Sequence, residues 1–257
     1  MKNKVVRRVL TIIFSVVFIV STVLGTLPSL AAGSNKTDLV NAVEFTTAAA
    51  SVSSGTKLKV PSGTANAIKG KVPVYKKYYF KGDLSEYSSS SPIANITDGD
   101  INTQARSALS VFAEKNAAGT EANYYTDGTQ AYVDLIYLLD EVFEIQQITY
   151  VSSGNESTNN YATTTAEYKV YVGDAQDALM SDANMVAHVN NRTNKKIVQN
   201  ITVKDGKTLS GKYVGLRIID PTIAKSENGT TNILTSASNN VYPRIQEFAV
   251  FTKVDYS

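Results

Sequence analysis

The sequence of 257 residues predicts an all-β fold, an antiparallel sandwich or barrel, over most of its length. Short runs rich in Tyr, Val, Ile and Thr are separated by Gly, Asn, Asp and Ser, as is typical of strands joined by turns. No helical period persists beyond about three turns. Apolar residues recur instead at every second position, so that Tyr168, Val170 and Val172 share one face of a predicted strand.

The strand pattern repeats along the chain. It covers residues 71–80, 131–139, 145–152, 166–173, 195–203, 212–219 and 244–252. Residues 174–186 are expected to form a helix or turn excursion that crosses between sheets. Two long polar connections, residues 153–165 and 220–242, are where we expect a binding surface, because long loops in compact domains usually carry function.

The N-terminal segment, residues 1–31, has the pattern of a secretory signal peptide. A basic head precedes an apolar run over residues 9–24, and small residues allow cleavage after Ala31 or Ala32. The run borders on transmembrane length, so an uncleaved anchor is the alternative. Residues 32–63 are expected to be a linker or flexible leader with at most one short helix, and residues 64–257 one β-sandwich domain. The predicted location is extracellular or at the cell surface, with no membrane span after cleavage.

Composition excludes several classes of function. The chain has no cysteine, which excludes disulfides, a thiol nucleophile and thiolate zinc sites. The formal charge of +2 includes Lys2, Lys4, Arg7 and Arg8 of the signal, so the mature chain is near neutral and nucleic acid is not an expected partner. An exported chain with this signal and no cysteine is typical of a bacterium.

An acidic turn, "TDGDINT" at residues 97–103, is a candidate cation site. Calcium takes six to eight oxygen ligands, and Asp98, Asp100 and Thr103 supply oxygens around a glycine that permits a sharp bend. The turn lacks the twelve-residue spacing of an EF-hand. An Asx turn without metal is the alternative interpretation.

Taken in order, several segments resemble the discoidin family, also known as the coagulation factor V/VIII C-type domains, and within it the family-32-like carbohydrate-binding modules. They are "ANAIKGKVPV" (65–74), "PIANITDGDINT" (92–103), "QAYVDLIY" (130–137), "YKVYVGD" (168–174), "GKYVGLRIID" (211–220) and "RIQEFAVF" (244–251). The resemblance implies an eight-stranded jelly-roll-like β-sandwich of galactose-binding-domain-like topology.

The chain departs from the family pattern in its aromatic residues and in one glycine. It has no Trp, and Gln104 and Tyr132 stand near the positions where the family usually has one. Ile136 replaces the family's glycine after the Asp-Leu pair. These departures put the local core packing in question more than the fold.

The resemblance also implies a structural calcium ion. Its ligands would be Asp98, Asp100 and Thr103 of the turn and Glu247 of the last strand. Glu247 lies in an alternating strand where an unpaired inward carboxylate would be costly without a cation. The role expected for the ion is stability.

The two long connections hold side chains suited to sugars, which bind through planar hydrogen-bonding groups and aromatic faces. The candidate ligand-binding residues are Asn155, Asn160, Tyr161, Asn239, Asn240, Tyr242 and Arg244, with Tyr124 and Tyr125 as a second aromatic candidate. In the resembled modules the ligand surface lies on loops at one end of the sandwich. Loops of this composition also serve solubility alone, and Tyr242 and Arg244 also suit a structural role before the last strand.

Catalysis is not predicted. No nucleophile elbow accompanies the single histidine, His188, and the available carboxylates show no arrangement of acid opposite nucleophile. Those carboxylates are Asp134, Asp140, Glu141, Glu144 and Glu156. The sequence therefore favours a non-catalytic module that binds a glycan or cell-surface polysaccharide for adhesion or substrate targeting. The alternatives are a protein- or lipid-surface-binding domain, with Ile233 and Leu234 as an apolar spike, and the N-terminal binding part of a larger secreted glycan-active enzyme.

Overall fold

The computed structural model describes residues 36–48, 58–78, 92–105, 122–123, 133–154, 164–220, 233–234 and 244–254. The predicted signal peptide lies outside these segments, all of which belong to one compact unit over residues 35–257. The helices are α2 (Lys36–Ala42), the 3-10 turns η1 (Ile93–Ile96) and η4 (Asp182–Asn184), and α3 (Asn191–Asn194). The strands are β1 (Val43–Ala48), β2 (Thr64–Asn66), β3 (Tyr75–Tyr78), β4 (Ala122–Asn123), β5 (Val133–Ser152), β6 (Glu167–Gly173), β7 (Met185–Asn190), β8 (Val198–Val203), β9 (Leu209–Asp220), β10 (Ile233–Leu234) and β11 (Ile245–Lys253).

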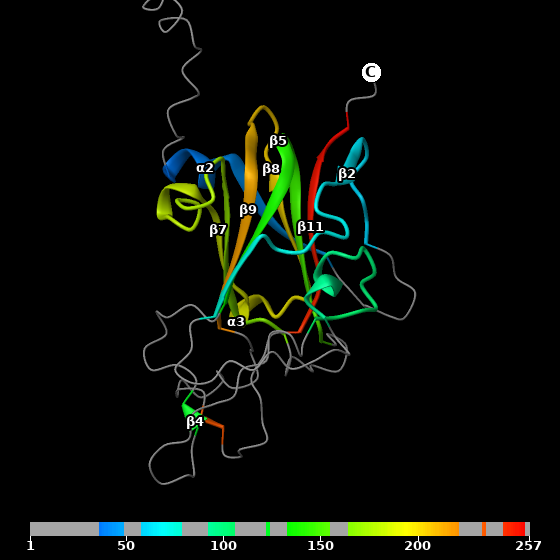
Figure 1. The fold of residues 1–257 in the computed structure, drawn as a ribbon, viewed down its shortest axis with the longest axis vertical. Coiled ribbons are helices and arrows are strands. Elements are labelled where there is room, and N and C mark those ends of the chain that lie inside the picture. Colours follow the sequence, from blue (N-terminus) through cyan, green and yellow to red (C-terminus); the bar gives the residue numbers. More distant parts are fainter. Residues whose placement is uncertain are drawn as a thin grey trace, which may run out of the picture. The chain divides into compact units, whose positions relative to one another are not determined.

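Antiparallel pairing joins the described strands throughout, which confirms the predicted all-β class. The main sheet has the order β1-β8-β5-β9-β6-β7, while β11 pairs with β5 and β2, and β3 pairs with β5 (Figure 1). Strands β4 and β10 form a separate two-stranded sheet. The apolar faces of these strands enclose one large core, as the period of two in the sequence predicts.

Strand β5 pairs with four other strands. Residues 133–136 pair with β3, residues 133–138 and 143–145 with β9, residues 147–151 with β8, and residues 145–152 with β11. The register shifts between Leu138 and Phe143. The sequence pattern predicts two strands here, because residues 140–142 have the composition of a turn. These exposed residues form instead the irregular middle of one strand.

Tyrosine and phenylalanine supply the large rings of the core in this chain without Trp. Tyr150 and Tyr168 stack with their ring centroids 4.4 Å apart, and the ring centroids of Tyr137 and Phe248 lie 5.8 Å apart. The Tyr168 hydroxyl donates to Gln199 Oε1 at 2.5 Å, which satisfies its polar end inside the core.

Part of the predicted leader contributes to the sheet. Residues 36–42 form α2, which packs on β7, and β1 pairs along its whole length with β8. Val43 of β1 is buried in the core. The short "VEFTTA" run of β1 gains its stability from main-chain bonds to β8, a partner more than 150 residues away that local sequence pattern does not reveal.

A smaller apolar cluster covers the outer face of the sheet around Ile136. Residues 174–184 form turns that pack Leu179 and Met180 against this face. Gly215 of β9 lies opposite Ile136, and a Cβ there would stand 2.9 Å from Met180 Cε. The bulk of Ile136, where the resembled family has glycine, is thus accommodated beside a glycine on the neighbouring strand.

Replacing Gly215 by valine is expected to lower the free energy of unfolding by about 1–3 kcal/mol, because the added side chain overpacks the contact with Leu179 and Met180. Urea unfolding measures the change. Ser210→Val, at an exposed position of the same strand, is the control for β-propensity and should leave stability nearly unchanged. Equal stability of both variants and the parent would contradict the close packing.

Candidate functional site

The acidic turn is organised by its own side chains. Asp98 Oδ1 accepts the Asp100 amide at 2.8 Å, and Asp98 Oδ2 accepts the Thr103 hydroxyl at 2.7 Å. The carboxylate of Asp100 instead accepts the amide and side chain of Asn102, which lowers the pKa of Asp100. The turn therefore brings Asp98 and Thr103 together and directs the Asp100 carboxylate to Asn102.

Buried residues on both sides fix this turn to the sandwich. Ile96 and Ile101 are buried, and Thr97 donates its hydroxyl to the Lys71 carbonyl at 2.5 Å. Gly99 has a φ of 83°, in the left-handed region that favours glycine, and a Cβ there would meet Lys69 Cε at 2.9 Å. The bend that the sequence motif predicts is thus built around Gly99.

Glu247 reaches the turn from β11. The residue is fully buried, and its Oε2 accepts the Gly99 amide at 2.9 Å. None of the described residues donates a hydrogen bond to its Oε1. Burial, with Asp98 and Asp100 nearby, raises the pKa of Glu247 to about 8, while the Gly99 amide opposes that shift. Burial and Glu247 together also raise the pKa of Tyr137.

These oxygens suit a hard cation such as calcium in their chemistry. The orphaned Glu247 Oε1 is a buried acceptor beside Asp98, the arrangement that a bound cation would satisfy. The described residues contain no cluster of three or more His, Cys, Asp or Glu side chains in a metal-holding arrangement. Hydroxyl and carbonyl oxygens would therefore have to complete the coordination, and Asp100 would contribute its carboxylate only after leaving Asn102.

The residues at which the long connections leave and rejoin the strands, here called the stems, lie together at one end of the sandwich. The Ser153 amide donates to the Arg244 carbonyl at 2.8 Å, and the Thr164 hydroxyl donates to the Ser153 carbonyl at 2.8 Å. Ala105 and Ile245 exchange backbone hydrogen bonds of 2.8 and 3.1 Å. The connections that begin at Ser153 and end before Arg244 therefore enter and leave beside each other, next to the segment that carries the acidic turn.

Arg244 is the one predicted ligand-binding residue within the described segments. It is partly exposed and directly precedes β11. The others, together with the aromatic candidates of residues 124–125 and the carboxylate of Glu156, lie outside the described residues. They are Asn155, Asn160, Tyr161, Asn239, Asn240 and Tyr242. Ile233 and Leu234, the predicted apolar spike, form β10, in which Ile233 pairs with Asn123 and Leu234 pairs with Ala122 of β4.

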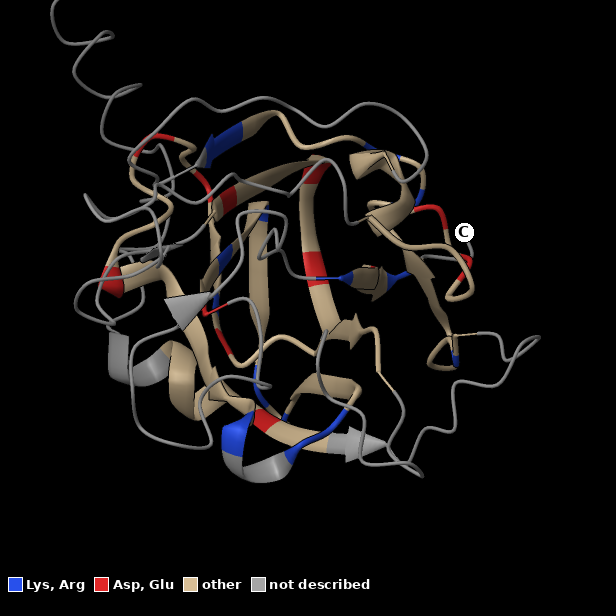
Figure 2. Ribbon diagram, turned by 90° about the horizontal axis from the view of Figure 1, so that it is seen from below, with Lys and Arg blue, Asp and Glu red and all other residues tan. Residues whose placement is uncertain are grey.

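Several carboxylates that were candidates for catalysis are engaged by basic side chains. Asp134 forms a bidentate ion pair with Arg217, at 2.7 Å for each bond. Asp140 pairs with Lys71 at 2.7 Å, and Glu144 pairs with Lys253. Figure 2 shows acidic and basic residues interspersed over the described ribbon. These pairs give the carboxylates structural partners.

The single histidine belongs to an ionic network that the sequence analysis did not identify. His188 lies on the edge strand β7, with its Nε2 2.8 Å from Glu167 Oε1. Arg192 of α3 donates to Glu167 at 2.7 Å and also contacts Asp220. The network joins β6, β7, β9 and α3 at the end where Asp220 leads into a long connection.

Comparison with known proteins returns structures only. No family model and no curated protein sequence matches the chain. The similar solved structures include family 32 carbohydrate-binding modules. The module of Streptococcus pneumoniae EndoD has 13% identity and a TM-score of 0.46, covering 74% of this chain and 100% of its own. A Clostridium perfringens module, CBM32-3 of a family 31 glycoside hydrolase, has 15% identity and a TM-score of 0.41, covering 75% of this chain and 96% of its own.

A third similar structure is the family 32 module of C. perfringens NanJ in complex with galactose. It has 12% identity and a TM-score of 0.36, and the alignment covers 69% of this chain and 99% of that one. Among the helices of the described segments, none has the length and apolarity needed to cross a membrane.

Proposed function

We propose that the chain is an exported, non-catalytic module that binds glycans for adhesion or substrate targeting and is stabilised by calcium. The observation that carries the proposal is the meeting of the long-connection stems at Ser153, Thr164 and Arg244, beside the segment of the acidic turn. This geometry gathers at one end the stems of two connections that contain several asparagines and one tyrosine each.

The chemistry of these residues suits neutral sugars. Amide and guanidinium groups form directed hydrogen bonds with hydroxyls, and aromatic rings pack on the apolar face of a pyranose. Arg244 supplies the guanidinium at the stem, and Tyr161 and Tyr242 are the expected aromatic contacts. The location is expected to be extracellular, either as an independent binder or as the binding part of a larger glycan-active enzyme.

Calcium would act on stability. Glu247 and Asp98, with the Thr103 hydroxyl and neighbouring carbonyls, would hold the ion, and Asp100 would join if its carboxylate turned from Asn102. The ion would neutralise the buried carboxylate and fix the turn to β11. Because Ala105 pairs with Ile245, that fixation would extend to the stems of the binding end.

A glycan array probed with the mature chain, residues 33–257, tests the function. Galactose and N-acetylgalactosamine-β-1,3-galactose, present in structures of C. perfringens modules, are the first sugars to include. Arg244→Ala is expected to weaken binding about tenfold, as the loss of a charge-assisted hydrogen bond does. Lys204→Ala, an exposed cation in the turn after β8, is the matched control and should bind like the parent.

Unchanged binding by Arg244→Ala, Tyr161→Ala and Tyr242→Ala would contradict the assignment of the ligand to this end. An array blank from folded protein would reject the glycan function in favour of a protein or lipid surface. Repeating the array with a calcium chelator separates a ligand-binding role of calcium from the stabilising role proposed here.

A further inference from the structure

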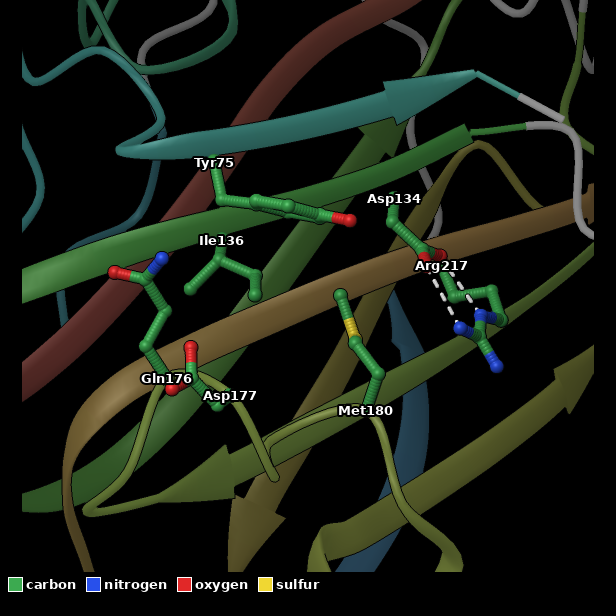
Figure 3. Close-up of a pocket in the computed structure, with 7 residues that line it drawn as sticks. All are labelled: Tyr75, Asp134, Ile136, Gln176, Asp177, Met180 and Arg217. Atoms are coloured by element: carbon green, nitrogen blue, oxygen red, sulfur yellow. Dashed lines mark hydrogen bonds and ion pairs between the residues drawn. The ribbon is translucent and has the colours of Figure 1, made fainter.

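A pocket lies on the outer face of the sheet, and none of the stem residues Ser153, Thr164 and Arg244 lines it. It encloses about 220 Å³ and is lined from strands β3, β5 and β9 and from the turns after β6 (Figure 3). Its polar wall is the ion pair of Asp134 and Arg217, and its aromatic wall is Tyr75. Four segments distant in sequence thus contribute to one concave surface.

The Asp134–Arg217 pair is a fixed feature of this pocket. Asp134 is 1% exposed, and both of its oxygens bind Arg217 in a planar, two-bond arrangement. The guanidinium also lies 5.7 Å from the centroid of the Tyr171 ring. Arg217 is the partly exposed member of the pair, so its guanidinium, held in place by Asp134, provides a preorganised polar edge for a ligand hydroxyl.

The floor and one side of the pocket are apolar. Ile136 forms the floor between Tyr75 and Met180, whose side chain points into the space in Figure 3. The turns approach the sheet this closely because Gly215 has no side chain. Tyr75 is 38% exposed and so keeps an aromatic surface accessible to solvent.

Two polar side chains complete the rim. Gln176 and Asp177 line the pocket from the turns, and none of the described residues forms a hydrogen bond with either side chain. An amide offers both donors and an acceptor, and a carboxylate offers acceptors. The rim therefore has hydrogen-bonding capacity opposite the fixed ion pair.

We propose that this pocket is a second carbohydrate subsite, which binds one neutral sugar ring on the face of the sheet. An aromatic wall and an apolar floor suit the C–H face of a pyranose, while the acceptors and donors at the edges suit its hydroxyls. The lining has two carboxylates and one guanidinium, a balance that favours neither a strong anion nor a strong cation. Its volume is below the roughly 300–1,000 Å³ of sites for drug-sized ligands, which fits a single ring.

This proposal does not depend on the ligand site at the loop stems. A chain with both sites could bind two sugars of the same glycan-coated surface at once. Its avidity for a dense glycan would then exceed the affinity of either site alone. Weak single-site binding, with dissociation constants in the millimolar range, is expected for so small a contact.

Backbone amide NMR on the mature chain tests the subsite, with titration by D-glucose, D-galactose, D-mannose and N-acetyl-D-glucosamine up to tens of millimolar. At least one sugar is expected to shift amides of residues 75, 134–136 and 176–180. Tyr75→Ala and Asp177→Asn are each expected to raise the dissociation constant on the order of fivefold. Both changes lie at exposed positions, so the folded sheet should be retained.

Matched controls are Val74→Ala, next to Tyr75 and exposed, and Asp205→Asn, an exposed carboxylate in the turn after β8. Both should bind like the parent. The Arg244→Ala variant distinguishes the two sites, because it should leave these shifts intact. Absence of pocket shifts with every sugar, or pocket shifts that persist unchanged in Tyr75→Ala and Asp177→Asn, would overturn the proposal. If Arg244→Ala alone removed all sugar binding, the stem site would stand and the sheet-face subsite would be rejected.

Discussion

Arg217→Met is expected to lower the free energy of unfolding by about 3–5 kcal/mol, among the largest effects of a single substitution in this chain. The substitution leaves Asp134 with a carboxylate that is 1% exposed and without its bidentate partner. Methionine keeps much of the volume, so the loss reflects the uncompensated charge. Urea denaturation at neutral pH measures the change.

The double variant Asp134→Asn with Arg217→Met is the informative companion. It removes the buried charge together with its partner, so most of the lost stability should return. Lys71→Met breaks the pair with Asp140, whose side chain is 81% exposed, and should cost little. If Arg217→Met and Lys71→Met were equally mild, the Asp134 carboxylate would not depend on its ion pair as its 1% exposure implies.

Glu247→Gln is expected to stabilise the calcium-free protein at pH 8 to 9 and to remove its response to calcium. The folded pKa of Glu247, about 8, exceeds the ordinary value of 4.5, so the folded state binds the proton more tightly than the unfolded state. This contribution to stability is fully present below about pH 4.5 and is lost as pH rises to about 8. Glutamine keeps the shape and carries no charge at any pH.

Thermal unfolding across this pH range, with calcium or with a chelator, provides the measurement. For the parent we expect the calcium-dependent rise in Tm to be larger at pH 8 than at pH 5, since calcium binds the ionised carboxylate. Asp98→Ala should also lose the calcium response. Glu44→Gln, an exposed glutamate on β1, is the control and should retain it. Identical melting of the parent with and without calcium at pH 8 would reject the proposed site.

The fold class was predictable because a period of two survives in the sequence wherever one face of a strand is buried, as at Tyr168, Val170 and Val172. The continuity of β5 was not predictable, since the exposed residues 140–142 have the local pattern of a turn. Strand β7 was also missed, because its six residues follow directly on turns and only their pairing with β6 distinguishes them. Both the continuity of β5 and the formation of β7 depend on pairing with other strands rather than on local sequence.

The two candidate sites also differ in how far local sequence predicts them. The acidic turn is contiguous, so Asp98, Gly99 and Thr103 were identifiable together, and the resemblance supplied Glu247 from the far end of the chain. The sheet-face pocket has no contiguous motif. Tyr75, Asp134 and Gln176 come together only through the register of β3 on β5 and the close approach of the turns.

The continuity of β5 has a mechanical consequence. One continuous strand forms backbone ladders with β3, β8, β9 and β11, so these four strands cannot separate while β5 keeps all of its partners. Unfolding should therefore occur in a single cooperative step, with the same transition reported by any spectroscopic probe. If the chain serves the proposed tethering function, a pulling force on it would be shared by the four backbone ladders that β5 forms.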